Sequence, residues 1–118
     1  MPAFVFICHD GGDKTALRNQ HLLEHLAFAE KMEPHILIGG PCPSLDRGAP
    51  QFGSSLVVLK ADNADAARAM LESDPYFRHK VWDRYEMKAF TPVTGAWIGG
   101  RTWDVVGGKV VRRPQQPT

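Results

Sequence analysis

Four short apolar runs and two helical patterns alternate along this chain, and their order predicts an α+β fold with a ferredoxin-like βαββαβ sheet. The apolar runs are rich in β-branched and aromatic residues and are bounded by glycine, proline or aspartate, as strands usually are. The helical patterns place apolar residues on one half of a helical wheel. Strand, helix, strand, strand, helix, strand is the order of a split βαβ unit, whose two helices cover one face of an antiparallel sheet. The other face needs a cover, which a second copy of the sheet would provide, so we expect a homodimer.

The first half of the chain supplies a strand, a helix and a second strand. We expect the first strand at residues 4–8 and a helix from residue 14 to about residue 32. Asp13 can cap that helix because its carboxylate can accept the free N–H groups of the first turn. Glu33-Pro34 ends it, and the second strand at 35–39 is predicted to stop at the glycine and prolines of 40–43.

The second half repeats the pattern after a polar, turn-forming loop at 44–51. The third strand is predicted at 54–60. Asp62 then caps an alanine-rich helix that stops before Pro75. The segment 82–90 alternates well enough to be the fourth strand.

Residues after Pro92 leave this pattern, so we divide the chain into a domain at 1–92 and a C-terminal extension at 93–118. Apolar residues around glycine pairs at 97–100 and 105–111 predict short, hairpin-like strands. The stretch from Arg112 is expected to be a loose end. Trp97 and Trp103 are costly to leave in water, so we expect the hairpin to pack on the body or on the partner subunit.

Length and composition are those of one soluble globular domain. The chain has 118 residues, 43% hydrophobic and 23% charged, with a net charge of +1. Dispersed charge gives no support for a nucleic-acid partner, no apolar run reaches the ~20 residues of a membrane span, and the start lacks the basic region of a signal peptide. Cys8 and Cys42 fit neither a zinc spacing nor a disulfide framework. We expect a cytoplasmic protein with no nucleic-acid or membrane partner.

The first candidates for chemistry are His25 and Asp74. His25 falls in the apolar stripe of the first predicted helix, and Asp74 opens an Asp-Pro-Tyr-Phe segment after the second. Such groups are either hydrogen-bonded structural residues or the acid–base groups of a small pocket. Asp before Pro is also a common turn opener. If Asp74 accepts a hydrogen bond from one ring nitrogen, it fixes the tautomer and raises the basicity of the other nitrogen, which makes His25 a usable base.

Other polar residues gather around His25 on the same helix. Arg18 lies ~20° from it on the helical wheel. A cation on a packed face needs a carboxylate or a bound anion to offset its desolvation, and Asp74 is one candidate for that carboxylate. His21, Glu24 and His25 also match the H-x-x-E-H pattern of zinc peptidases. Glu24 points roughly 100° away from His25 and no downstream helix offers an obvious third ligand, so we expect no metal there. Neither cysteine has a base partner by spacing, which argues against a nucleophilic thiol.

Several short motifs recur here in a recognisable order from the first strand to about Phe90. They are Arg18 with His25-Leu26-Ala27-Phe28, Ile38-Gly39-Gly40-Pro41, Gly53-Ser54, Ala66-Ala67 and Asp74-Pro75-Tyr76. The order and spacing of these motifs resemble those of the YciI-like, or YCII-related, family. The resemblance implies a dimeric α+β barrel with sheets paired face to face and a pocket with a His–Asp pair, here His25 and Asp74. It also implies a lyase-type activity, since dehydrochlorination of a hydroxylated aromatic is assigned within the family.

The chain departs from the family pattern at three places. Leu22 stands where many members have a second arginine, and Lys80 stands where others often have glycine. The extension after Pro92 is not covered by the resemblance.

We therefore expect a lyase or isomerase, without metal or organic cofactor, that moves a proton on a small phenolic or anionic substrate. His25 and Asp74 are the predicted catalytic residues, Arg18 binds the anionic group, and Asp10 and Ser54 are polar groups of the pocket wall. An alternative is a non-catalytic, dimeric module that binds a small ligand in the same pocket or serves as an accessory protein. A third hypothesis makes the glycine-hinged tail a protein-docking element.

Overall fold

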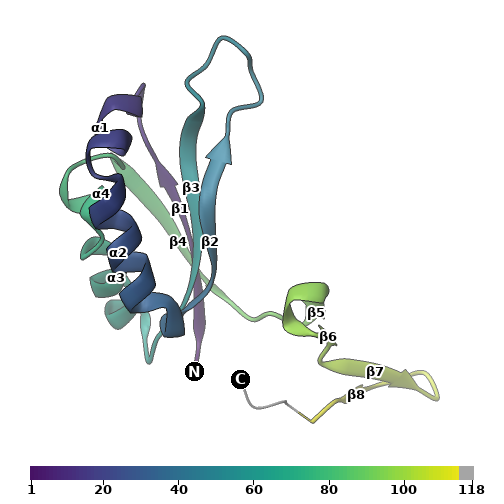
Figure 1. The fold of residues 1–118 in the computed structure, drawn as a ribbon. Coiled ribbons are helices and arrows are strands. Elements are labelled where there is room, and N and C mark those ends of the chain that lie inside the picture. Colours follow the sequence, from purple (N-terminus) through teal and green to yellow (C-terminus); the bar gives the residue numbers. More distant parts are fainter. Residues whose placement is uncertain (115–118) are drawn as a thin grey trace.

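The computed structural model describes residues 1–114 and shows the ferredoxin-like α+β fold (Figure 1). Four antiparallel strands form one sheet in the order β2-β3-β1-β4. They are β1 (Ala3–His9), β2 (Ile36–Pro43), β3 (Phe52–Lys60) and β4 (Arg84–Phe90). This is the strand order of a split βαβ unit, so the predicted fold class is confirmed.

The helices lie together on one side of the sheet (Figure 1). They are α1 (Thr15–Gln20), α2 (Leu22–Met32), the 3₁₀ turn η1 (Glu33–His35), α3 (Ala64–Glu72) and α4 (Pro75–Arg78). The single helix expected at 14–32 is thus two helices, which meet at a non-helical His21 with φ −106° and ψ 13°. No helix among residues 1–114 is both long enough and apolar enough to cross a membrane.

Neither predicted cap residue is the N-cap of its helix. The N-cap of α1 is Lys14, although Asp13, one residue earlier, still binds the first turn. The carboxylate of Asp13 accepts hydrogen bonds from the backbone N–H of Thr15 at 3.0 Å and from its hydroxyl at 2.7 Å. The cap of α3 is Asn63 rather than Asp62, because its side-chain oxygen accepts from the N–H of Ala66 at 2.8 Å.

The strands also differ from the predicted bounds. β2 runs on through Pro41 to Pro43, where we expected it to stop. It is an edge strand, and prolines are tolerated there because one side of the strand needs no ladder donors. Pairing of Pro43 with Phe52 also starts β3 two residues early, while β4 starts at Arg84 rather than at residue 82.

The hydrophobic core lies mainly under α3 and α4. Alternate residues of the central strand β1 point into it and meet the buried side chains of the two helices and of the segment that follows α4. The buried core residues are Phe4, Phe6, Cys8, Leu59, Ala61, Ala67, Leu71, Tyr76, Val81 and Trp82. In contrast, α2 has no fully buried residue, and even its Leu26 is 51% exposed. The first long helix therefore leaves space between itself and the sheet.

The C-terminal extension forms two small sheets beyond β4, and the second of them runs away from the main sheet and its helices (Figure 1). Its elements are β5 (Thr94–Gly95), η2 (Ala96–Ile98), β6 (Gly100–Arg101), β7 (Trp103–Val106) and β8 (Lys109–Arg112). Gly107 and Gly108 join β7 to β8 with φ of 58° and 76°, the left-handed backbone that a tight hairpin needs.

The extension does not bury both tryptophans in the single chain. Trp97 is 86% exposed, whereas Trp103 is partly buried and donates a hydrogen bond to Thr94 at 2.8 Å. Contact with a partner subunit stays a prediction, as do the homodimer and the division of the chain at residue 92. The first two residues of the predicted loose end are not loose, since Arg112 belongs to β8 and Arg113 binds Asp104 at 2.7 Å. Residues 115–118 lie outside the described part of the chain.

Candidate active site

A cavity of about 650 Å³ lies between the first helices and the β2–β3 half of the sheet. Most of its wall is apolar, and the gap left by α2 accounts for its size. The main apolar contributors are Leu22, Leu26, Ala29, Phe52, Val57 and Leu59. Three of the predicted site residues also line it, namely Arg18, His25 and Asp74. The fold therefore gathers a small set of polar groups in an apolar cavity, which is the usual form of a small-molecule site.

His25 and Asp74 form a direct hydrogen bond in this wall. The Nδ1 atom of His25, on α2, lies 2.8 Å from Oδ1 of Asp74, which precedes α4. The same Oδ1 accepts from the backbone N–H of Tyr76 at 2.9 Å, as the N-cap of α4. The two roles considered for Asp74, turn opener and histidine partner, are thus both present. A carboxylate only accepts, so Nδ1 carries the proton in this contact, and in the neutral imidazole Nε2 is the nitrogen with the lone pair.

Aromatic side chains hold the imidazole in place. The ring of His25 stacks on that of Tyr76 with centroids 3.8 Å apart and an interplanar angle of 3°. The hydroxyl of Tyr76 donates to the backbone oxygen of Arg18 at 3.0 Å, and burial raises the pKa of this phenol, which keeps it protonated as a donor. Trp82 completes the wall, edge-on to His25 at 6.1 Å.

Trp82 carries a polar group that the protein does not use. Its indole Nε1 is buried and has no hydrogen-bond partner among residues 1–114. Buried polar atoms are nearly always paired, so this donor is an exception that the contacts within residues 1–114 do not explain.

Arg18 is held by Asp10 rather than by Asp74. Its Nε lies 2.7 Å from Oδ2 of Asp10 and its Nη2 lies 2.8 Å from Oδ1, a bidentate pair in which Asp10 is fully buried. Nη2 also contacts the backbone oxygen of Ser54 at 3.3 Å and the hydroxyl of Ser55 at 3.2 Å. The carboxylate that the buried arginine needed is therefore Asp10, and the two charges offset each other.

Two of the predicted wall residues lie behind the cavity rather than in it. Asp10 and Ser54 do not line it, while Ser55, the neighbour of Ser54 on β3, does. Adjacent side chains on a strand point to opposite faces, so a shift of one residue exchanges the serine that faces the helices. Sequence reasoning also missed Tyr76 and Trp82. Tyr76 stood in the Asp-Pro-Tyr motif, but nothing local in the sequence indicated its stacking on His25.

Cys8 is a buried thiol of the core. Burial, reinforced by the nearby carboxylates of Asp74 and Asp10, raises its pKa from 9.0 to about 12. It stays protonated at neutral pH, so it cannot serve as a thiolate nucleophile.

Comparison with known proteins places this site in a recognised domain. The family described as the YCII-related domain matches residues 3–91. Protein YciI of Escherichia coli O6:H1 and Protein YciI of Shigella flexneri are each 30% identical to the chain over 95 residues, which is 76% of this chain and 97% of each relative.

One solved structure supports the fold independently. The 5-chloro-2-hydroxyhydroquinone dehydrochlorinase (TftG) from Burkholderia phenoliruptrix AC1100, in complex with 2,5-dihydroxybenzoquinone, matches with a TM-score of 0.68 at 20% identity. The match covers 80% of this chain and 96% of that chain. At this level of identity the likeness concerns the arrangement of strands and helices.

Proposed function

This chain belongs to the YCII-related domain family, and on that premise we propose that it is a small-molecule lyase or isomerase that works by proton transfer at His25. The substrate we propose is a small, oxygen-bearing aromatic such as a phenol or hydroxyquinone. No metal or organic cofactor enters the proposed reaction.

The observation that carries the proposal is the 2.8 Å contact between His25 and Asp74 in the cavity wall. A general base must be oriented and must hold its proton on the other nitrogen before the substrate arrives. Asp74 meets the second requirement, and its own bond to the N–H of Tyr76 holds it still. The stacked ring of Tyr76 supports the first requirement, because it limits rotation of the imidazole.

The cavity supports an aromatic substrate. Its wall is largely apolar and includes the aromatic side chains of Phe52, Tyr76 and Trp82, against which an aromatic ring can pack. The dehydrochlorinase that shares this fold was solved with a dihydroxybenzoquinone, a molecule of this size and chemistry. Chlorinated hydroxyhydroquinones and related phenols are therefore the first compounds to screen.

Arg18, Asp10 and Ser54 have supporting roles in this proposal. Because Asp10 offsets the charge of Arg18, the arginine acts as a hydrogen-bond donor within a neutral pair rather than as a free cation. A neutral or weakly anionic ligand suits this wall better than a strongly anionic one, whose charge would have to be desolvated without compensation. Asp10 and the backbone oxygen of Ser54 hold the guanidinium in position.

The test compares substrate turnover and binding in matched variants. His25→Asn removes the base, and Asp74→Asn removes the charge while keeping a side-chain oxygen that can still cap α4. His35→Asn, outside the cavity on η1, is the control. We expect a ~10²–10⁴-fold loss of turnover in His25→Asn, a clear loss in Asp74→Asn, and none in the control.

The same experiment separates the enzyme from the alternative function. Long-range ¹H–¹⁵N NMR should show the Nδ1–H tautomer of His25 in the wild type, with a redistribution in Asp74→Asn. Full turnover in His25→Asn would refute the proposal. A compound that binds in the cavity of every variant and is never converted would instead indicate the non-catalytic ligand-binding module.

A further inference from the structure

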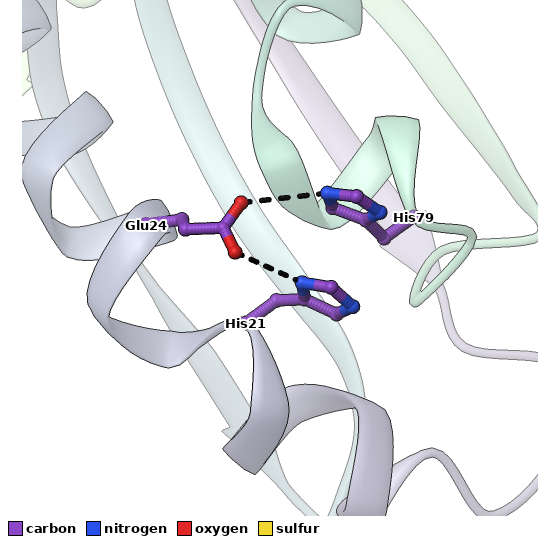
Figure 2. Close-up of side chains that lie close together, drawn as sticks. All are labelled: His21, Glu24 and His79. Atoms are coloured by element: carbon purple, nitrogen blue, oxygen red, sulfur yellow. Dashed lines mark hydrogen bonds and ion pairs between the residues drawn. The ribbon is translucent and has the colours of Figure 1, made fainter.

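A second cluster of polar side chains lies outside the cavity, where three segments of the helical layer meet (Figure 2). His21 occupies the junction between α1 and α2, Glu24 lies in the first turn of α2, and His79 directly follows α4. One carboxylate oxygen of Glu24 is 3.3 Å from Nδ1 of His21, and the other is 3.4 Å from Nε2 of His79. Figure 2 shows the carboxylate facing both rings.

We propose that His21, Glu24 and His79 form a binding site for a divalent transition-metal ion of the zinc class. One potential ligand atom from each residue lies within 4.8 Å of the others. Nothing in this inference depends on the proposed enzymatic function, because none of the three residues lines the cavity that holds His25 and Asp74.

The spacing of the donor atoms favours a shared ion over simple hydrogen bonding. Charge-assisted N–H···O bonds are usually ~2.7–2.9 Å long, so contacts of 3.3 and 3.4 Å are long for strong bonds. In a tetrahedral zinc site, metal–ligand distances of ~2.0–2.2 Å separate two ligand atoms by about 3.4 Å. Each histidine nitrogen already lies at about that distance from one of the two carboxylate oxygens of Glu24, so the nitrogen–oxygen distances fit a shared ion once the rings turn.

The types of ligand select the class of metal. Two imidazole nitrogens and one carboxylate oxygen suit Zn²⁺, Co²⁺, Ni²⁺ or Cu²⁺, whereas Mg²⁺ and Ca²⁺ favour sites built from oxygen atoms. Two histidines and a glutamate are three protein ligands, which leaves a fourth position for water.

Binding must change the arrangement of the two rings. The imidazoles of His21 and His79 are stacked, with centroids 3.7 Å apart and planes within 6° of parallel. A metal bonded to an imidazole nitrogen lies near the plane of that ring, so one ion cannot serve two parallel rings and the rings must splay. The side chain of His79 is 41% exposed and has more room to turn than that of His21, which is mostly buried in the helix junction. Loss of the stacking is therefore a specific signature of this site.

The structure also explains why the zinc pattern in the sequence was misleading. In H-x-x-E-H, the second histidine would be His25, but that ring is turned to Asp74. The ring that joins His21 and Glu24 is His79, which follows α4 and is 55 residues further along the chain than Glu24. An ion here would connect the α1–α2 junction to the end of α4; α2 carries His25, and Asp74 caps the start of α4.

The test is a metal titration of the untagged, chelator-treated full-length chain with Zn²⁺ by calorimetry and with Co²⁺ by visible absorption. The variants are Glu24→Gln and His79→Asn, both at exposed positions, with His35→Asn as the histidine control and Cys42→Ser to remove the partly exposed thiol. We expect one Zn²⁺ per chain, about 100-fold weaker binding in each ligand variant, and wild-type binding in both controls. NMR should show Zn²⁺ shifting the ring signals of His21 and His79 with loss of their mutual ring-current effect.

Several results would overturn the inference. They are the absence of stoichiometric binding to the wild type, unchanged affinity in Glu24→Gln and His79→Asn, or equal weakening in His35→Asn or Cys42→Ser. A Zn²⁺ effect confined to His25 would also contradict it. If light scattering shows that binding occurs only with metal-induced association, the ligands come from two molecules and the single-chain site is wrong.

Discussion

Replacing Asp10 by asparagine leaves the guanidinium of Arg18 in the protein interior without its counter-charge. Asp10 is fully buried and makes two short bonds to Arg18, at 2.7 and 2.8 Å, and Arg18 is itself buried. Removal of one partner of such a pair typically costs 3–5 kcal/mol, because the remaining charge stays desolvated. Asparagine keeps one acceptor oxygen, so we expect about 3 kcal/mol for Asp10→Asn and a somewhat larger loss for Arg18→Met.

Removal of both partners should cost much less than the sum of the single losses. The double variant Asp10→Asn/Arg18→Met leaves no buried charge, so we expect a coupling free energy of at least ~2 kcal/mol in the double-mutant cycle. The exposed pair Asp65–Arg68, three residues apart on α3 at 3.0 Å, is the matched control. Its removal by Asp65→Asn should change the free energy of unfolding by less than about 1 kcal/mol.

Equilibrium unfolding in urea measures these differences directly. With an m-value of ~1.5 kcal/mol per M, a loss of about 3 kcal/mol lowers the midpoint by about 2 M. If Arg18→Met costs no more than Asp65→Asn, or if the two site variants are additive, the pair is not a structural unit. Arg18 would then be free to act as the substrate cation that the sequence suggested.

Three further predictions concern the rest of the chain. Lys80 has a left-handed φ of 59°, so Lys80→Gly should raise the free energy of unfolding by about 1 kcal/mol in thermal melts. Gly11 has a φ of 69° and an added Cβ would meet the side chain of Asp83, so Gly11→Ala should lower the free energy of unfolding. The unfolded chain loses the Cys8 proton near the ordinary pKa of 9.0, whereas burial raises the pKa in the folded chain to about 12. As the pH rises from 9 to 12, the unfolded state therefore binds fewer protons, and the free energy of unfolding should fall by at most ~1.4 kcal/mol per pH unit. Between pH 8 and pH 10.5, the fall in the free energy of unfolding should be smaller in Cys8→Ala than in the wild type, and the same as in the wild type in Cys42→Ala. Truncation after Pro92 should leave the far-UV circular dichroism of the main sheet and its melting temperature unchanged. Loss of the cooperative melting transition would show that the extension is part of the fold. A changed elution volume in gel filtration, with the melting transition intact, would assign the extension to assembly.

The sequence by itself determined the order of strands and helices and the candidate pair His25 and Asp74. Periodicity is a local property, because a side chain's direction within one helix or strand depends on its own backbone. A histidine in an apolar stripe and an aspartate before proline were therefore visible without any knowledge of how the elements pack. Element ends were less predictable, since Pro41 and Pro43 are acceptable in β2 only because that strand lies at the sheet edge.

Only the tertiary structure decided which polar groups meet. Arg18 finds Asp10 at the end of β1, Ser55 rather than Ser54 faces the helices, and His79 reaches the side chain of Glu24. Each of these contacts joins segments that are far apart in the sequence. The distance between them in space depends on the angle at which the helices cross the sheet and on the register in which the strands pair. A shift of one residue in register, or a break such as that at His21, redirects every following side chain. Contacts across elements follow from the packing of the whole domain, and no single segment of sequence contains that information.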